Sequence, residues 1–128
     1  MATYWLFKTN PEMFSYDDLE RTDAWPWQIS RAAARRLAHA LGPCSLSFIF
    51  HAGSEQAIVG VAEVLTAPYA DPPRIDVAAR GRLGRPISLA ELKQNPEFAA
   101  WELLRHPRLA IVPVNAAIWE RVLQLAQR

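Results

Sequence analysis

The side chains of this sequence that could perform chemistry are of the kinds that hold a flat ligand beside a phosphate. An apolar run over residues 4–7 ends in Lys8 and Thr9, whose ammonium and hydroxyl groups can meet a ligand edge or a phosphate. Trp27, in a predicted loop, offers a ring for stacking, which is worth about 1–3 kcal/mol per base. Arg31 stands in the first turn of a predicted helix, where an acid would suit the helix dipole better, so a functional role is favoured. These residue types indicate a binding site.

A fifth candidate is His51, which ends a predicted strand before the loop Ala52-Gly53-Ser54. An equally good interpretation is a structural histidine that bonds a nearby backbone carbonyl. The other histidines show no ligand spacing with His51, and Cys44 is the only cysteine, so we expect neither a metal site nor an internal disulfide. No nucleophile with a base, pair of carboxylates or glycine-rich phosphate loop is recognisable, so we expect a chain that is not an enzyme and needs no cofactor.

Composition predicts one globular domain over residues 1–128. The chain is 51% hydrophobic and 21% charged, with a formal net charge of +1. That charge argues against a strong field for any nucleic acid, although arginine clusters at residues 31–36 and 74–85 allow a local basic patch. The sequence has no signal-peptide pattern and no apolar stretch of about 18 residues, so we expect no membrane association. A single cysteine fits a reducing, cytoplasmic location.

The elements that must position these side chains alternate between strands and helices. Predicted strands cover residues 3–8, 45–51, 57–65, 74–82 and 109–114, and the second and third form a hairpin. Predicted helices follow the cap residues Ser15, Ser30, Ser88 and Asn115, with one more starting at Pro96. The helix after Ser30 would run over residues 31–41, and Gly60 inside a strand marks a bulge or a barrel corner. This mixture of elements predicts a small α+β barrel.

Several blocks of the sequence, in this order, resemble the EVE domain, a family of the PUA-like superfamily. The blocks are Tyr4-Trp5-Leu6-Phe7-Lys8 with its Pro11-Glu12 turn, Ser15-Tyr16-Asp17-Asp18-Leu19, Trp27 with Arg31, and residues 48–51, 58–64, 86–93 and 108–114. The resemblance covers nearly the whole chain. Residues 67–74 are shorter than the proline-rich and aromatic-rich excursion that the family has at this place, so the chain resembles a shortened member.

The resemblance implies a PUA-like mixed β-barrel with flanking short helices. It also implies a reader of DNA or RNA, in which one modified base is turned out of its strand and held in an aromatic pocket. Turning out a base costs a few kcal/mol, and burying a methyl group returns about 0.8 kcal/mol. Ligand-binding residues would be Lys8, Thr9, Trp27, Arg31 and His51, gathered at one end of the barrel.

Two other functions stay open at the level of the sequence. The chain could be a receptor for a small molecule or a nucleotide-derived metabolite, because the short segment 67–74 could leave the pocket too open to grip a duplex. It could also be a protein-interaction module without a working pocket, since Ala32, Ala33 and Ala34 replace polar residues of the family.

Overall fold

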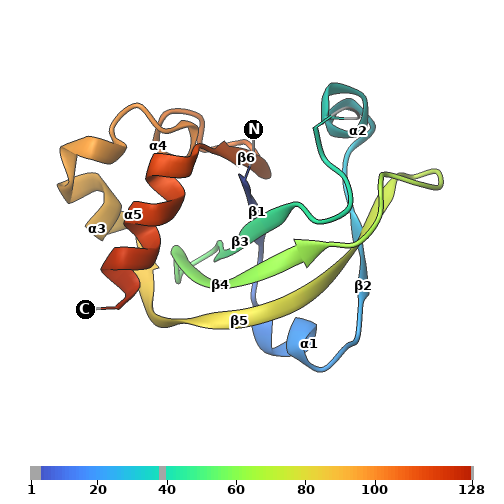
Figure 1. Ribbon diagram of the computed structural model, residues 1–128, viewed down its shortest axis with the longest axis horizontal. Coiled ribbons are helices and arrows are strands. Elements are labelled where there is room, and N and C mark those ends of the chain that lie inside the picture. The colour runs from blue at the N-terminus through green and yellow to red at the C-terminus, as the bar shows by residue number, and fades with distance from the viewer. Residues whose placement is uncertain (1–3, 38–39, 128) are drawn as a thin grey trace.

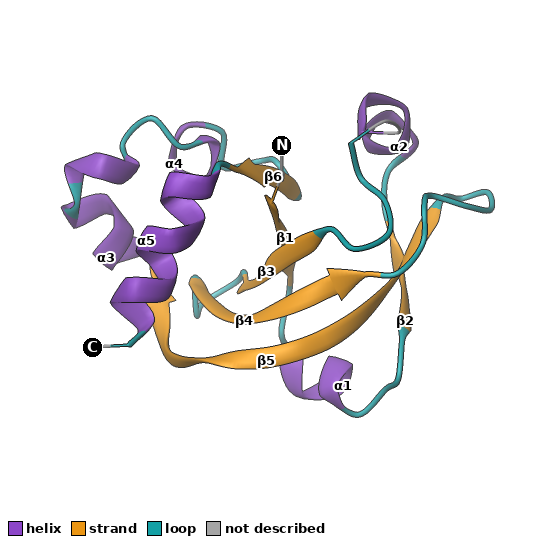
Figure 2. Ribbon diagram, in the orientation of Figure 1, coloured by secondary structure: helices purple, strands orange, loops and turns teal. Residues whose placement is uncertain are grey.

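A curved, mixed sheet forms the centre of the molecule (Figures 1 and 2). The computed structural model describes residues 4–37 and 40–127. Its strands are β1 (Tyr4–Thr9), β2 (Trp25–Gln28), β3 (Leu46–His51), β4 (Ala57–Val64), β5 (Arg74–Ser88) and β6 (Ile111–Val114). The sheet order is β2-β5-β4-β3-β1-β6, with β1 and β3 parallel and the other neighbours antiparallel. With β2 and β6 as its two edges, the sheet curls into a half-barrel.

Short helices flank this half-barrel. They are α1 (Tyr16–Glu20), α2 (Arg31–Leu37), α3 (Leu89–Gln94), the 3₁₀ turn η1 (Pro96–Phe98), α4 (Glu102–Arg105) and α5 (Ala116–Ala126). Figure 1 shows α3, α4 and α5 gathered at one end of the sheet, whereas α2 stands alone beside the other end. This α+β architecture, a mixed sheet with short flanking helices, is the one that the sequence predicted.

Strand β1 is buried on both of its faces, which explains its unbroken apolar sequence. Trp5 and Phe7 point to a cluster that includes Tyr16 and the inner side of α2, whereas Leu6 points to a second cluster around Trp101 and Trp119. Lys8 and Thr9 are the last two residues of β1. They pair with Phe50 and His51 at the end of β3, which places them at the rim of the sheet. The end of β1 is therefore a rigid support.

The predicted helix caps are confirmed by their hydrogen bonds. The Oγ atoms of Ser15, Ser30 and Ser88 each accept from the backbone N–H three residues later, at 3.2, 3.0 and 3.1 Å. Asn115 does the same through Oδ1, at 2.8 Å. The predicted hairpin of β3 and β4 is also confirmed, and its register shifts beside Gly60, as expected of a bulge. A Cβ on Gly60 would lie 2.5 Å from the Tyr16 ring, so only glycine fits there.

Three predicted boundaries are wrong. The segment around Trp27, predicted as a loop, is strand β2, which pairs with β5 and tolerates Pro26 because it lies at an edge. Strand β5 runs on to Ser88 rather than stopping at residue 82, because its second half also pairs with β4. Helix α2 is described as Arg31–Leu37; of the predicted helix 31–41, residues 38–39 lie outside the described residues, and Ala40 and Leu41 are not helical.

Candidate ligand-binding site

A cavity of about 370 Å³ opens between α2, β2 and the connection that leads into β6. We call it the Trp27 cavity. Its polar and aromatic lining residues are Lys8, Trp27, Gln28, Ser30, Arg36 and Arg108. The pairing of β1 with β6 brings Lys8 next to this connection, although the two are about a hundred residues apart in the chain. The cavity is thus built from both ends of the sequence.

The aromatic wall of the cavity is held in place by its neighbours. Ring centroids of Trp27 and Phe7 lie 5.7 Å apart, and the Phe14 ring meets Trp27 edge-on at 6.0 Å. Phe14 also stacks on Trp25, with centroids 4.5 Å apart. Such contacts hold the Trp27 ring in place, so the part of the side chain that lines the cavity is preformed.

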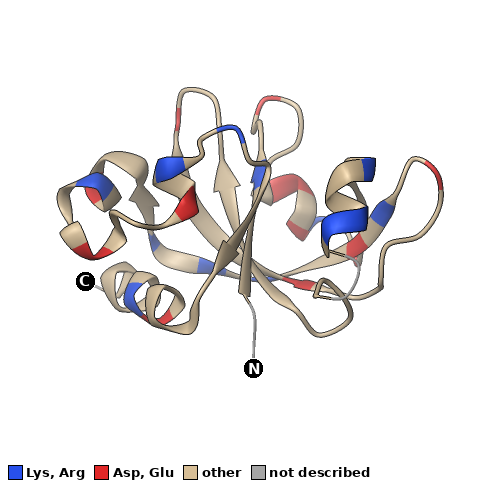
Figure 3. Ribbon diagram, turned by 90° about the horizontal axis from the view of Figure 1, so that it is seen from above, with Lys and Arg blue, Asp and Glu red and all other residues tan. Residues whose placement is uncertain are grey.

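Three cations line the Trp27 cavity, and no acidic residue does so among the residues that the structure describes. The Lys8 ammonium donates to the carbonyl of Pro107 at 2.8 Å, and burial lowers the pKa of Lys8 below its ordinary value. Arg36 and Arg108 form no ion pair within the described ranges. Figure 3 shows the basic segments of α2 in blue, across from blue segments at the end of β1 and in the connection before β6.

Arginines elsewhere are mostly neutralised by acids. In the second arginine cluster, Arg80 pairs with Glu63 at 2.8 Å, Arg85 pairs with Glu91 at 2.7 Å, and Arg82 pairs with Asp17 and Glu20. Those guanidinium groups are committed to the protein itself. Three cations without an ion pair among the described residues, Lys8, Arg36 and Arg108, lie together at the Trp27 cavity, although the net charge is only +1.

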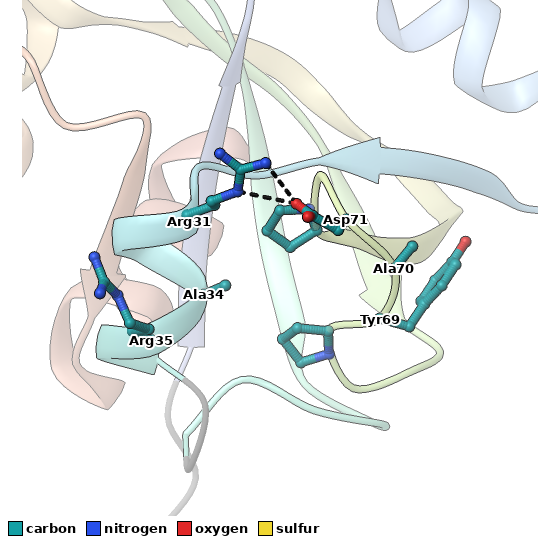
Figure 4. Close-up of a pocket in the computed structure, with 8 residues that line it drawn as sticks. Arg31, Ala34, Arg35, Tyr69, Ala70 and Asp71 are labelled. Atoms are coloured by element: carbon teal, nitrogen blue, oxygen red, sulfur yellow. Dashed lines mark hydrogen bonds and ion pairs between the residues drawn. The ribbon is translucent and has the colours of Figure 1, made fainter.

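Arg31 lies outside this cavity. Its Nε and Nη2 atoms donate to Asp71 Oδ1 at 2.9 and 2.7 Å (Figure 4). The pair spans a second opening of about 480 Å³ between α2 and residues 68–73, which we call the Pro68 hollow. The structure therefore brings Lys8 and Trp27 together but separates Arg31 from them.

Thr9 and His51 lie side by side on β1 and β3 and hold the loop that follows β1. Thr9 Oγ1 donates to the carbonyl of Phe14 at 2.7 Å. The His51 ring, 6% exposed, accepts from the N–H of Tyr16 through Nε2 at 3.0 Å. Its hydrogen must then be on Nδ1, which lies 2.9 Å from Glu55 Oε1. Neither side chain lines the Trp27 cavity, and both contacts fix the backbone that carries Phe14.

Sequence reasoning missed four polar residues of the cavity: Gln28, Ser30, Arg36 and Arg108. Arg36 carried a signal, because residues 32, 33 and 36 fall on one face of a helix. Ser30 was recognised only as a cap. The sequence carried no comparable signal for Arg108, whose place depends on the pairing of the first and last strands.

No cluster of three or more histidine, cysteine or acidic side chains in the described part of the chain could hold a metal ion. None of the helices described is long and apolar enough to cross a membrane.

Comparison with known proteins identifies relatives of the whole chain. A family model described as the EVE domain matches residues 3–125. A Rhodopseudomonas palustris protein solved by NMR is 26% identical, with a TM-score of 0.90, over 98% of this chain and 94% of that one. None of the curated proteins compared with the chain matches it.

Two similar structures contain modified nucleic acid. Human THYN1, in complex with DNA containing 5-methylcytosine, is 22% identical with a TM-score of 0.89, over 99% of both chains. The YTH domain of Zygosaccharomyces rouxii MRB1, in complex with N6-methyladenosine RNA, is 14% identical with a TM-score of 0.65, over 98% of this chain and 87% of that domain. These likenesses confirm the predicted PUA-like fold.

Proposed function

Because the chain belongs to the EVE domain family, we propose that it binds nucleic acid by holding one modified base, turned out of its strand, in the Trp27 cavity. The observation that carries this proposal is the combination of a fixed aromatic side chain with cations that form no ion pair with any described residue. A flat base needs the first, and the phosphates beside it need the second. The human relative bound to 5-methylcytosine DNA and the fungal domain bound to N6-methyladenosine RNA support the ligand class.

In this proposal the cavity residues contact different parts of the nucleotide. Trp27 stacks on the base, while Gln28 and Ser30 can hydrogen-bond to its edge. Lys8 and Arg108 both line the cavity and would contact phosphates. The activity is binding, so the chain acts as a reader rather than an enzyme.

The remaining predicted site residues would act outside the Trp27 cavity. Thr9 and His51 would fix the loop that carries Phe14, and Phe14 in turn orients Trp27. Arg31 would contact the ligand outside the Trp27 cavity, from the other side of α2.

A titration of tryptophan fluorescence with short oligonucleotides tests the proposal. The oligonucleotides carry cytosine, 5-methylcytosine, adenine or N6-methyladenine, as DNA and as RNA, in single and double strands. Burial of one methyl group predicts a preference of about fourfold or more for one modified base. Equal affinity for all modified and unmodified strands would contradict base reading.

Repeating the titration at several salt concentrations separates this function from the metabolite receptor. If Lys8, Arg36 and Arg108 each neutralise one phosphate of a single strand, the logarithm of the binding constant should fall against the logarithm of salt with a slope of about −2. A slope near zero, with tight binding of a free nucleoside, would instead favour a receptor for a small nucleotide-derived ligand. No binding of any oligonucleotide or nucleoside would favour the interaction module.

A further inference from the structure

Helix α2 separates two openings of the surface. Ala32, Ala33 and Arg36 line the Trp27 cavity, whereas Arg31, Ala34 and Arg35 line the Pro68 hollow. Because successive residues of a helix are about 100° apart, these two sets lie on opposite sides of α2. The helix therefore forms a wall between the two openings, and only a ligand long enough to cross the helix could reach both.

The outer surface of this wall is basic. Arg31, Arg35 and Arg36 are all exposed, and neither Arg35 nor Arg36 forms an ion pair within the described part of the chain. Figure 4 shows the Arg35 guanidinium turned outward from α2 rather than toward residues 68–73. In the same view one nitrogen of Arg31 points away from Asp71. That atom, Nη1, makes no hydrogen bond to any described residue, since Nε and Nη2 take the Asp71 contacts.

The Pro68 hollow offers apolar surface against which a nucleoside could pack. Its lining includes Ala34, Pro68 and Pro73, and its volume is about 480 Å³. The one acid in its lining, Asp71, has its charge offset by Arg31 at 2.7 Å. An apolar hollow beside exposed guanidinium groups suits a sugar and base whose phosphate stays outside.

We propose that a nucleic-acid strand straddles α2, with the modified base in the Trp27 cavity and a flanking nucleoside of the same strand in the Pro68 hollow. The phosphates between them would cross the ridge formed by Arg31, Arg35 and Arg36. An α-helix is about 10–12 Å across, so the strand must extend beyond the modified base by more than one nucleotide to cross α2. This second subsite rests on the proposed function and adds to it a minimum ligand length.

Two lengths of ligand test the second subsite. One is a trinucleotide centred on 5-methylcytosine or N6-methyladenine, whichever the wild-type chain prefers, and it is too short to cross α2. The other is a single strand with the same base and several unmodified nucleotides on each side. We expect the longer strand to bind more tightly, with a steeper salt dependence.

A matched pair of variants on α2 fills one opening at a time. Ala34→Met places a longer side chain in the Pro68 hollow. It should weaken binding of the longer strand by about fivefold or more, which is the effect of losing one base contact, while the affinity for the trinucleotide stays the same. Ala32→Met places a longer side chain in the Trp27 cavity and should weaken binding of both ligands. Thermal unfolding of each variant shows whether its fold is intact.

A second variant does not depend on packing. Arg35→Gln should reduce the affinity of the longer strand and make its salt slope less negative by about 0.7, without affecting the trinucleotide. Lys93→Gln removes the same charge from the exposed surface of α3. It is the control and should change the affinity for neither ligand.

The outcomes are distinguishable. If the wild-type chain binds neither ligand, the proposed function fails and the second subsite with it. If both ligands bind and neither Ala34→Met nor Arg35→Gln affects the longer strand, only the second subsite is wrong. Loss of trinucleotide binding in Arg35→Gln would also overturn the subsite, because it would place Arg35 at the base itself.

Discussion

At the scale of single residues, the candidate site depends on one ring and one ammonium group. Trp27 is packed between Phe7 and Phe14 and still presents a surface to the Trp27 cavity. Lys8 ends the most buried strand and is tied to the connection before β6 by its side chain and its backbone N–H. Both groups are held in position before a ligand arrives, which lowers the entropy cost of binding.

Replacing Trp27 should remove the stacking face. We expect Trp27→Ala to weaken binding of the preferred oligonucleotide by about 1–3 kcal/mol, and Trp27→Phe to lose less because a ring remains. Fluorescence anisotropy of a labelled oligonucleotide measures both. Trp25→Ala is the matched control, since Trp25 stacks on the same Phe14 but does not line the cavity. A larger loss of affinity in Trp25→Ala than in Trp27→Ala would show that Trp25, and not Trp27, stacks on the base.

The pKa of Lys8 predicts proton uptake on binding in alkaline buffer. Burial lowers the pKa of Lys8 in the free protein, so the side chain begins to lose its proton below the usual lysine value of about 10.4. A bound phosphate favours the charged ammonium and raises the pKa again. Binding should therefore take up protons at moderately alkaline pH and none near neutrality, where Lys8 is already protonated.

Calorimetric titration in two buffers of different ionisation enthalpy measures this uptake. Lys8→Met removes the titrating group and should abolish the difference between the buffers. An unchanged proton uptake in Lys8→Met would show that another group titrates and that Lys8 does not contact phosphate.

At the scale of elements, the loop between β1 and α1 supports the aromatic wall. His51 and Thr9 reach it from neighbouring strands, and the capping box of Ser15 and Asp18 fixes the start of α1. Phe14 lies within this loop, so the orientation of Trp27 depends on hydrogen bonds that involve no ligand.

His51→Ala should lower stability more than it lowers binding. The variant leaves the N–H of Tyr16 without its buried acceptor, which costs about 1–3 kcal/mol of unfolding free energy. Urea unfolding measures the loss, and Glu55→Gln, which keeps an acceptor for Nδ1, should lose less. An equally stable His51→Ala protein that no longer binds the modified base would place His51 in direct contact with the ligand.

Local sequence patterns were sufficient for most of the elements. Ser15, Ser30, Ser88 and Asn115 fixed the helix starts because a cap is a contact between residues three apart. Strand β2 was missed because a four-residue edge strand with a proline in it has the sequence of a loop. Its partner, β5, lies some fifty residues away, and only that pairing makes it a strand.

The candidate site was predictable only in part for the same reason. Lys8 and Trp27 have recognisable local settings, a strand end and an aromatic cluster. Arg108 reaches the cavity through the pairing of β1 with β6. Arg31 was expected beside Trp27 from the family resemblance and from its place in the first turn of a helix, but it lines the Pro68 hollow on the opposite side of α2.

At the scale of the whole molecule, the distribution of charge matters more than its sum. A net charge of +1 includes β5 arginines that pair with acids, Arg80 and Arg85, and cavity cations that form no ion pair with any described residue. The cations at the Trp27 cavity therefore form a local positive field that suits a phosphate chain.

The most direct test of the Trp27 cavity is a map of amide chemical shifts, recorded by NMR while the preferred modified oligonucleotide is added. We expect the largest changes in the Trp27 indole and in the backbone of Gln28, Ser30 and Ala110, which line the cavity. The face formed by α3 and α5 should not respond. Changes confined to that face, with the Trp27 indole unaffected, would contradict base binding in the Trp27 cavity.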